Sequence, residues 1–496
     1  MAWTREQRYR KYSSWSPQLV AALEKQAAAS SFKPGYHISP RSGLLNDPNG
    51  FSYFNGQWHV FYQSFPFGPV HGLKSWVHCV STDLVSWQNL GLALEPSNQY
   101  DSHGAYSGSA LNVDDRLFLA YTGNVRSADW QRTSYQNGAW LDQNNHLVKC
   151  PSPLIVPPDH VTEHFRDPQL LKHGKTYYIL AGAQDKESRR GQFSWFKSVD
   201  LKNWQDCGYL KQPWDDLGFM VECPNLVFVD GSPVLVFCPQ GLKRKQLDYQ
   251  NIYPNTYSIG TAFSFETGSF TASPASLTNL DEGFDVYASQ TFNAPNGQVY
   301  LISWIGLPEI EYPTDRENWA HCLSLVKELH VEAGQIVQTP VAAQSKLQTN
   351  SVALTPAVRQ NGVQVVKKNA GQQYQLELKI TADQQGCLLL AGDSEHHQGL
   401  RLSFDTGETG RFTVDRGFAG TSFAAKYGTT RNCVLPAHHE LTLNIFIDHS
   451  VCEIFLNGGR KVFTLRYFAP QENTEIAFIG ENELKYSGKY SQLKNM

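Results

Sequence analysis

Three short acidic motifs recur at similar points of a repeating unit, and their carboxylates are the groups best suited to chemistry. The motifs are Asn46-Asp47-Pro48-Asn49-Gly50, Arg166-Asp167-Pro168 and Glu222-Cys223-Pro224. Asp47 precedes an apolar segment that begins at residue 56, Asp167 one that begins at 174, and Glu222 one that begins at 231. A circular repeat brings equal positions to one axis. The spacing therefore predicts that the three carboxylates converge on one pocket.

Converging carboxylates are the equipment for cleaving a glycosidic bond. One carboxylate attacks the anomeric carbon or activates water, and a second, protonated one donates to the leaving oxygen. Taken singly, Asp47 also fits a turn and Asp167 an ion pair with Arg166, whereas Glu222 lies in the apolar run FMVECPNLVFV, where it is costly unless paired or protonated. The sequence has no H-E-x-x-H, G-x-S-x-G or phosphate-binding glycine motif. We therefore expect no metal site and no cofactor.

The repeat predicts a five-bladed β-propeller. Its apolar segments begin at residues 56, 115, 174, 231 and 297, so successive starts are 59, 59, 57 and 66 positions apart. A second echo, residues 81–87 and 198–204, is offset by 117 positions, or two units. Four strands with long loops fill a unit of this length. We expect the first strand of each unit, which carries the acid, to line the central channel. A β-sandwich with coincidental spacing is the alternative.

Composition changes after the fifth unit and divides the chain. All 12 Trp lie between Trp3 and Trp319, yet apolar and polar residues still alternate in the tail, as at residues 441–447. We expect an all-β fold, a propeller followed by a C-terminal β-sandwich. The expected divisions are a helical N-terminal extension over 1–34, the propeller over 35–340, a linker over 341–360 and the sandwich over 361–496.

Charge and apolar patterning exclude several classes of function. The net charge is −4, against the basic face that nucleic-acid binding needs. No secretory segment and no 18-residue apolar stretch is present, so we expect no membrane partner. Nine cysteines without a C-x-x-C pair fit free thiols in a reducing compartment, and we expect a cytoplasmic protein. The oligomeric state is left open.

Polar and aromatic residues near the acids suit sugar binding. At the equivalent register, the second unit offers Tyr106-Ser107-Gly108 and the fifth offers residues 285–290. Gln63 ends the strand that follows Asp47. Trp76 and Trp304 could form an apolar platform for a sugar ring, although each could equally be a core residue.

The motifs together resemble glycoside hydrolase family 32, the invertases and fructan hydrolases, over nearly the whole chain. They are HISPRSGLLNDPNG (37–50), FYQ (61–63), YSGSA (106–110), FRDP (165–168), ECPNL (222–226), FDVYASQTF (284–292) and SWIG (303–306). The resemblance implies that Asp47 is the nucleophile, Glu222 the acid/base, and Asp167 the residue that holds hydroxyls of the fructosyl ring. It further implies a fructose-binding set of Asn46, Gln63, Ser107, Arg166 and Trp304, which Asp285 would join.

One loop departs from the commonest family pattern. Residues 65–79 read FPFGPVHGLKSWVHC, with His71 and Lys74, and this form resembles the branch that hydrolyses sucrose 6-phosphate. His71, Lys74 and Arg126 are therefore candidate phosphate ligands, with Lys74 expected at the pocket rim. The expected substrates are sucrose, sucrose 6-phosphate and short fructo-oligosaccharides. Fructan hydrolysis, fructosyl transfer and a sugar-binding propeller without catalysis stay open as alternatives.

Two physical expectations follow from these roles. Apolar neighbours should raise the pKa of Glu222, so that it stays protonated until it donates, while Asp47 stays ionised to attack. The two carboxyl groups should lie about 5–5.5 Å apart, which is the distance of a retaining glycosidase.

Overall fold

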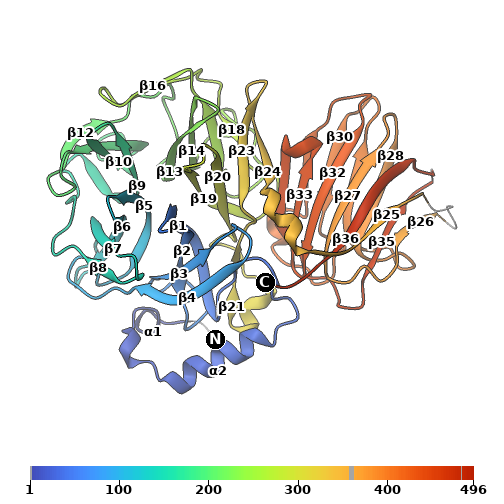
Figure 1. Cartoon of the computed structure of the whole chain (residues 1–496), viewed down its shortest axis with the longest axis horizontal. Coiled ribbons are helices and arrows are strands. Elements are labelled where there is room, and N and C mark those ends of the chain that lie inside the picture. Colours follow the sequence, from blue (N-terminus) through green and yellow to red (C-terminus); the bar gives the residue numbers. More distant parts are fainter. Residues whose placement is uncertain (1–2, 357–361, 482) are drawn as a thin grey trace.

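The computed structural model describes residues 3–356, 362–481 and 483–496. Figure 1 shows a ring of β-sheets beside a two-layered β-sandwich, with the N-terminal helices against one side of the ring. The five-bladed propeller and the C-terminal sandwich expected from the sequence are confirmed. The chain divisions at residues 34, 340 and 360 remain our proposal, and the division at 360/361 lies outside the described residues.

Each blade is built on four antiparallel strands, and the first strand of each sequence unit is the innermost one. Blade 1 contains β1 (Gly43–Phe54), β2 (Gln57–Phe65), β3 (Ser75–Ser81) and β4 (Trp87–Leu94), with β21 (Trp319–Ala320) parallel to β1. Blade 2 contains β5 (Ala105–Val113), β6 (Arg116–Arg126), β7 (Arg132–Leu141) and β8 (Leu147–Lys149). Blade 3 contains β9 (Val161–His173), β10 (Thr176–Asp185), β11 (Gly191–Ser198) and β12 (Gln205–Tyr209).

The last two blades carry short extra strands. Blade 4 contains β13 (Met220–Val229), β14 (Ser232–Gln240), β15 (Thr256–Ile259) and β18 (Thr278–Asn279), with a hairpin of β16 (Ala262–Ser264) and β17 (Ser269–Thr271). Blade 5 contains β19 (Val286–Asn293), β20 (Val299–Ile305), β23 (Lys327–Glu332) and β24 (Gln335–Pro340), with β22 (Cys322–Leu323) beside β20. Strands β1, β5, β9, β13 and β19 contact one another in sequence, and β19 contacts β1, so the ring closes.

The repeated seven-residue echo forms the same turn in blades 1 and 3. Asp83 accepts backbone hydrogen bonds from Val85 and Ser86, and Asp200 accepts them from the equivalent residues of its own blade. In each turn the following leucine is left-handed and accepts a hydrogen bond from the tryptophan indole, at 3.2 Å. Equal sequence thus gives equal local structure two blades apart.

The sandwich buries the apolar face of each alternating strand. One sheet has the order β25 (Gln348–Leu354), β36 (Tyr486–Leu493), β27 (Gln373–Ile380), β32 (Leu441–Asp448), β33 (Val451–Leu456), β34 (Lys461–Arg466). The other has the order β26 (Val363–Lys367), β35 (Glu475–Ile479), β28 (Gln385–Asp393), β29 (Gln398–Asp405), β30 (Arg411–Asp415), β31 (Thr430–Val434). Leu443, Ile445 and Ile447 point into this core. Strand β25 belongs to the sandwich although it lies within the expected linker.

Short helices start the chain and connect the sheets. α1 (Arg5–Arg8) is capped by Thr4, and α2 (Pro17–Ala28) is capped by Ser16 with Pro17 at its first position, where proline is tolerated best. The short 3-10 helices are η1 (Tyr12–Ser14), η2 (Pro313–Glu317), η3 (Ala342–Leu347), η4 (Ala425–Tyr427) and η5 (Asn457–Gly459). Tyr12 and Trp15 pack on the apolar cluster of the 65–73 loop, so the N-terminal segment covers one side of blade 1.

Candidate active site

Every innermost strand is bulged at its acid or equivalent motif. In each, two residues lie opposite one residue of the second strand: 46–47 in β1, 106–107 in β5, 167–168 in β9, 223–224 in β13 and 288–289 in β19. A bulge of this kind bends the strand and re-aims its side chains. Asp167 and Cys223 take left-handed backbone angles at their bulges, with φ of 62° and 47°. The bulges therefore turn polar side chains from several blades toward the axis.

The sequence repeat suggested that the three acids occupy equivalent positions in their strands. In the structure their positions relative to the bulge differ by one residue each. Asp47 is the second bulge residue of its strand, Asp167 is the first, and Glu222 is the residue just before the bulge. Counting from the apolar segments could not resolve these single-residue steps, because it ignores pairing register. The three carboxylates nevertheless lie close together, since the charges of Asp47 and Glu222 both act on the buried Asp167.

Asp47 is held by amide and hydroxyl donors of blades 1 and 2. Its Oδ1 accepts a hydrogen bond from Asn46 Nδ2 at 3.0 Å, and its Oδ2 accepts one from Gln63 Nε2 at 3.0 Å and one from the Ser107 hydroxyl. Donors of this kind stabilise an ionised carboxylate. The structure thus brings Asn46, Gln63 and Ser107 together around the acid at which the sequence analysis placed the nucleophile.

Glu222 is bound by one cation and two neutral donors. Arg166 donates to Oε1, while Tyr287 Oη and Gln240 Nε2 each donate to Oε2 at 2.6 Å. Burial opposes ionisation of Glu222, but the Arg166 charge and these hydrogen bonds outweigh it and lower the pKa of the carboxyl. The expectation of a raised pKa was wrong. Its apolar sequence neighbour Val221 packs into a hydrophobic core, whereas Arg166 of blade 3 reaches the Glu222 carboxylate.

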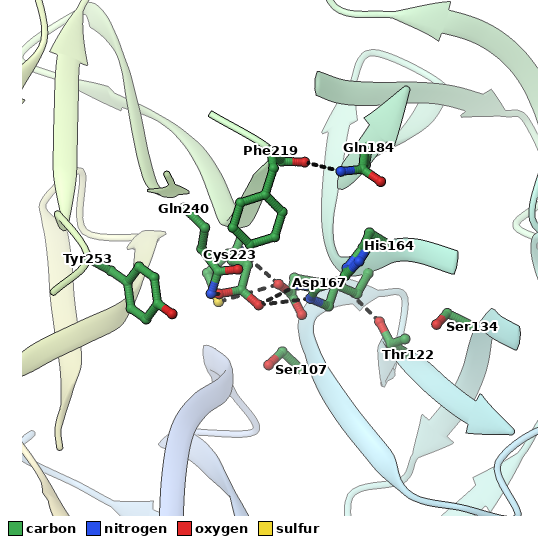
Figure 2. A network of polar contacts seen from close by, with 12 residues as sticks. Ser107, Thr122, Ser134, His164, Asp167, Gln184, Phe219, Cys223, Gln240 and Tyr253 are labelled. Atoms are coloured by element: carbon green, nitrogen blue, oxygen red, sulfur yellow. Dashed lines mark hydrogen bonds and ion pairs between the residues drawn. The ribbon is translucent and has the colours of Figure 1, made fainter. Parts of the chain in front are cut away.

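Asp167 takes the opposite environment. Burial, then the charges of Glu222 and Asp47 acting against Arg166, raise its pKa to about 7. Cys223 N donates to Asp167 Oδ2 at 3.0 Å, and Thr122 Oγ1 accepts from the Asp167 backbone N–H at 2.9 Å. Figure 2 shows Asp167 between Cys223 and Gln240 on one side and Thr122 and His164 on the other. Of Asp167 and Glu222, Asp167 is therefore the more readily protonated acid.

The aromatic and basic candidates contact one another and other rings. Trp304 is buried, and its ring lies 6.3 Å from the His71 ring and 6.2 Å from the Tyr287 ring. Lys74 is only 6% exposed and lies over the Tyr106 ring at 5.2 Å. We expected Lys74 at an open rim, and this was wrong. The N-terminal segment covers its loop, where Leu73 N donates to Arg8 O at 2.7 Å. Burial lowers the pKa of Lys74 to about 8, against the attraction of the three acids.

Two sequence candidates lie outside the pocket. Asp285 is fully buried at the contact with the sandwich, where it accepts hydrogen bonds from Tyr312 Oη, Arg416 Nη1 and Arg466 N at 2.7, 2.7 and 2.8 Å. Trp76 is also fully buried, and its indole donates to Tyr106 O. The expectation that Asp285 binds sugar was thus wrong, since all of its carboxylate contacts are internal. The 285–290 segment does reach the pocket, but through Tyr287.

Sequence reasoning missed the partners of the acid/base candidate. Gln240 and Tyr287 were assigned no role, although Tyr287 occurs in the family motif FDVYASQTF. His164 was also missed. Its Nδ1 contacts Arg166 Nη1 at 3.2 Å and Arg132 Nη2 at 3.0 Å, so a neutral imidazole links two guanidinium groups. Burial and the two arginines lower the pKa of His164 to about 4.

No group of three or more His, Cys, Asp or Glu side chains in residues 3–356, 362–481 and 483–496 is arranged to hold a metal ion. Within the same ranges, no helix has the length and apolarity needed to cross a membrane. All nine cysteines are free thiols.

A five-bladed propeller with acids that converge at its axis, followed by a sandwich, is the arrangement expected of a glycosidase. The family model "Glycosyl hydrolases family 32 N-terminal domain" matches residues 37–340, and its C-terminal counterpart matches residues 335–494. The chain belongs to glycoside hydrolase family 32, and it is a β-fructofuranosidase.

Similar proteins agree with this assignment over the full length of the chain. A sucrose-6-phosphate hydrolase of Pediococcus pentosaceus is 49% identical, covering 94% of this chain and 92% of its own. The structure of a sucrose-6-phosphate hydrolase from Lactobacillus gasseri is 49% identical, with a TM-score of 0.96 and complete coverage of both chains. A β-fructofuranosidase of Bombyx mori, solved as a mutant in complex with sucrose, is 28% identical, covering 96% of this chain and 98% of its own, with a TM-score of 0.83.

Proposed function

We propose that the protein hydrolyses sucrose 6-phosphate in preference to sucrose, inside the cytoplasm. Asp47 is the nucleophile, Glu222 the acid/base, and Asp167 the residue that binds hydroxyls of the fructosyl ring. Asn46, Gln63, Ser107, Arg166 and Trp304 bind the sugar with them. The similarity to sucrose-6-phosphate hydrolases over nearly the whole chain supports the phosphorylated substrate.

The observation that carries the catalytic assignment is the contrast between Asp47 and Glu222. Among the described residues Asp47 has only neutral donors, Asn46, Gln63 and Ser107, so its charge is stabilised without being neutralised by a directly bonded cation. A carboxylate in this state can attack the anomeric carbon of the fructosyl unit. Glu222 instead accepts hydrogen bonds from the Arg166 cation and the Tyr287 hydroxyl, which stabilise the carboxylate that remains after Glu222 has given up its proton.

Two steps account for retention of configuration. Glu222 protonates the glycosidic oxygen while Asp47 Oδ attacks the anomeric carbon, so the C–O bond to the leaving sugar breaks and a fructosyl–Asp47 ester forms. Glu222, now ionised, takes a proton from water, and the resulting hydroxide displaces Asp47. Arg166 stabilises the ionised form of Glu222 between these steps. Asp167 in its protonated or ionised form can exchange hydrogen bonds with ring hydroxyls.

Buried polar groups near the acids are available to a sugar. Asn46 Oδ1, His71 Nε2 and the Trp304 indole N–H are buried and have no hydrogen-bond partner among the described residues. Such groups cost free energy when left unpaired, so a ligand that supplies hydroxyls regains it. A polyhydroxylated substrate fits this requirement.

The proposal is tested by comparing kcat/KM for sucrose and sucrose 6-phosphate under the same conditions. We expect the phosphorylated sugar to be the better substrate by at least about tenfold, the effect of one charge-assisted contact. Equal values, or a preference for sucrose, would refute the substrate assignment but not the family.

A further inference from the structure

Two arginines face each other across the β6–β7 hairpin of blade 2, without a carboxylate between them. Arg126 ends β6, Arg132 begins β7, and they are direct cross-strand partners. Like charges in this position destabilise a hairpin. Neither arginine forms an ion pair among the described residues: Arg126 Nη1 donates to Trp130 O at 3.0 Å, and Arg132 Nη2 contacts His164 Nδ1. An anion would remove this repulsion.

The two guanidinium groups are also partly desolvated. The Nε atoms of Arg126 and Arg132 are both buried and have no hydrogen-bond partner in the described part of the chain. Burial, followed by the neighbouring Arg166, lowers the pKa of Arg132 to about 10. Arginine presents several donors in a planar fork that matches a phosphate group. The unpaired Nε atoms and the facing charges therefore both favour a phosphate-sized anion.

The arginine pair lies on the leaving-group side of the pocket. Arg132 contacts His164, His164 contacts Arg166, and Arg166 binds Glu222. The acid that protonates the glycosidic oxygen must lie beside the leaving sugar. A phosphate on that sugar is only a few bonds from the glycosidic oxygen, so it falls on the same side as this chain of contacts.

The N-terminal segment packs against the β6–β7 hairpin next to the two arginines. The Tyr9 ring lies 5.1 Å from the Trp130 ring and 5.7 Å from the His103 ring, and Arg5 lies 4.3 Å over the Trp130 ring. Tyr9, Arg126 and Arg132 all act electrostatically on the Tyr106 hydroxyl. Residues of the N-terminal segment and of blade 2 therefore lie side by side next to Arg126.

We propose that Arg126 and Arg132, with Tyr9 of the N-terminal segment, form the subsite for the phosphate group of the leaving sugar. This inference rests on the proposed function, the hydrolysis of a phosphorylated sucrose. It assigns a substrate-binding role to the N-terminal extension, whose first residues lie far from the acids in sequence.

Other basic residues fit the phosphate less well. Lys74 is buried, and its charge interacts favourably with the carboxylates of Asp47, Glu222 and Asp167. Lys243, in the basic run 243–245, is largely exposed and already paired with Asp216 at 2.7 Å. Lys74 and Lys243 are therefore offset by carboxylates close by, whereas Arg126 and Arg132 form no ion pair among the described residues and Arg132 feels only the more distant charge of Glu163.

The test compares Arg126→Gln, Arg132→Gln and Tyr9→Phe on sucrose and on sucrose 6-phosphate. Each arginine variant should lower kcat/KM for sucrose 6-phosphate by about 10- to 100-fold, the range for a lost charge-assisted hydrogen bond, and change sucrose hydrolysis little. Arg126→Gln is the cleaner variant, because Arg132 also contacts His164. Tyr9→Phe keeps the ring contacts and should give a smaller loss of the same selectivity.

Arg116→Gln is the matched control. Arg116 begins the same strand, β6, at its opposite end and lies 4.2 Å over the Trp140 ring, much as Arg126 lies over Trp130. This variant should leave both substrates unchanged. Lys74→Met should lower kcat/KM for both substrates alike, because the Lys74 charge interacts with the three acids and not with a phosphate.

Product inhibition gives a second readout that does not depend on turnover of the phosphorylated substrate. With sucrose as substrate, glucose 6-phosphate should inhibit wild type more strongly than glucose does, and Arg126→Gln should remove that difference.

The outcomes separate this inference from the proposed function. If wild type prefers sucrose 6-phosphate and the arginine variants keep that preference, the subsite is elsewhere and the proposed function stands. If the variants lose activity on both substrates equally, the arginines serve the fold and the inference is refuted. If wild type shows no preference, the proposed function fails and this inference fails with it.

Discussion

Arg166 binds Glu222 through two guanidinium nitrogens that both donate to the same oxygen, Nε at 2.9 Å and Nη2 at 2.7 Å from Oε1. The other oxygen accepts hydrogen bonds from Tyr287 and Gln240. All four contacts favour the ionised carboxylate, although the proposed role requires the protonated acid in the first step. The hydrogen bonds to Glu222 should therefore set the pH range of activity.

Tyr287→Phe should move the basic limb of the kcat/KM pH profile to higher pH. The hydrogen bond from Tyr287 lowers the pKa of Glu222, so its loss raises that pKa and keeps the acid protonated at higher pH. Tyr300→Phe is the control, since the Tyr300 hydroxyl bonds Asn296 and Gln298 away from the pocket. A basic limb that stays in place would show that another group controls it.

Asp47→Asn and Glu222→Gln should each lower kcat on sucrose by about 10²–10⁴-fold or more while the fold survives. An activated fructoside that needs no protonation distinguishes the two roles. Glu222→Gln should still form a fructosyl–enzyme with it, detectable as a mass increase on the intact protein, whereas Asp47→Asn should not. Equal behaviour of the two variants would contradict the assignment.

The Asp285–Arg416 ion pair should stabilise the contact between propeller and sandwich. Both side chains are buried, with Arg416 Nη1 2.7 Å from Asp285 Oδ2. Asp285→Asn leaves the Arg416 charge uncompensated and should lower the free energy of unfolding by about 3–5 kcal/mol, measured as a fall in Tm. The KM of the folded variant should change little, because Asp285 lies outside the pocket. A normal Tm with a raised KM would instead restore Asp285 to sugar binding.

His37 should make stability depend on pH. Its ring contacts Asp448 and Glu453 at 2.8 and 3.1 Å, and although burial opposes protonation, these two acids raise its pKa to about 9. The folded pKa exceeds the unfolded value of about 6.5, so the stabilisation is complete below pH 6.5 and lost as pH rises through 9.

The comparison is with His37→Gln, which cannot titrate at this position. The Tm advantage of wild type over this variant should narrow from pH 6.5 to pH 9. A constant difference across this range would show that His37 does not change its charge there.

The sequence by itself determined the repeat, the β-class and the three acids. A period near 59 residues and a segment echo two units apart are local patterns, and local patterns survive in one dimension. The bulges at the acids were not predicted, although Pro168 and Pro224 lie in two of them and proline cannot donate a hydrogen bond to a strand pair. The N-terminal helix and the alternating strands of the sandwich follow from the same kind of local information.

Only the tertiary structure decided that the pKa of Glu222 is lowered, that Lys74 is buried and that Asp285 contacts the sandwich instead of the pocket. Arg166 comes from blade 3, Tyr287 from blade 5 and Arg416 from the sandwich, each far in sequence from the carboxylate that it binds. The N-terminal segment likewise covers the 65–73 loop across the blade surface. A carboxylate or an ammonium group responds to the dielectric and charges within a few ångströms, and those neighbours are fixed only when distant strands pack together.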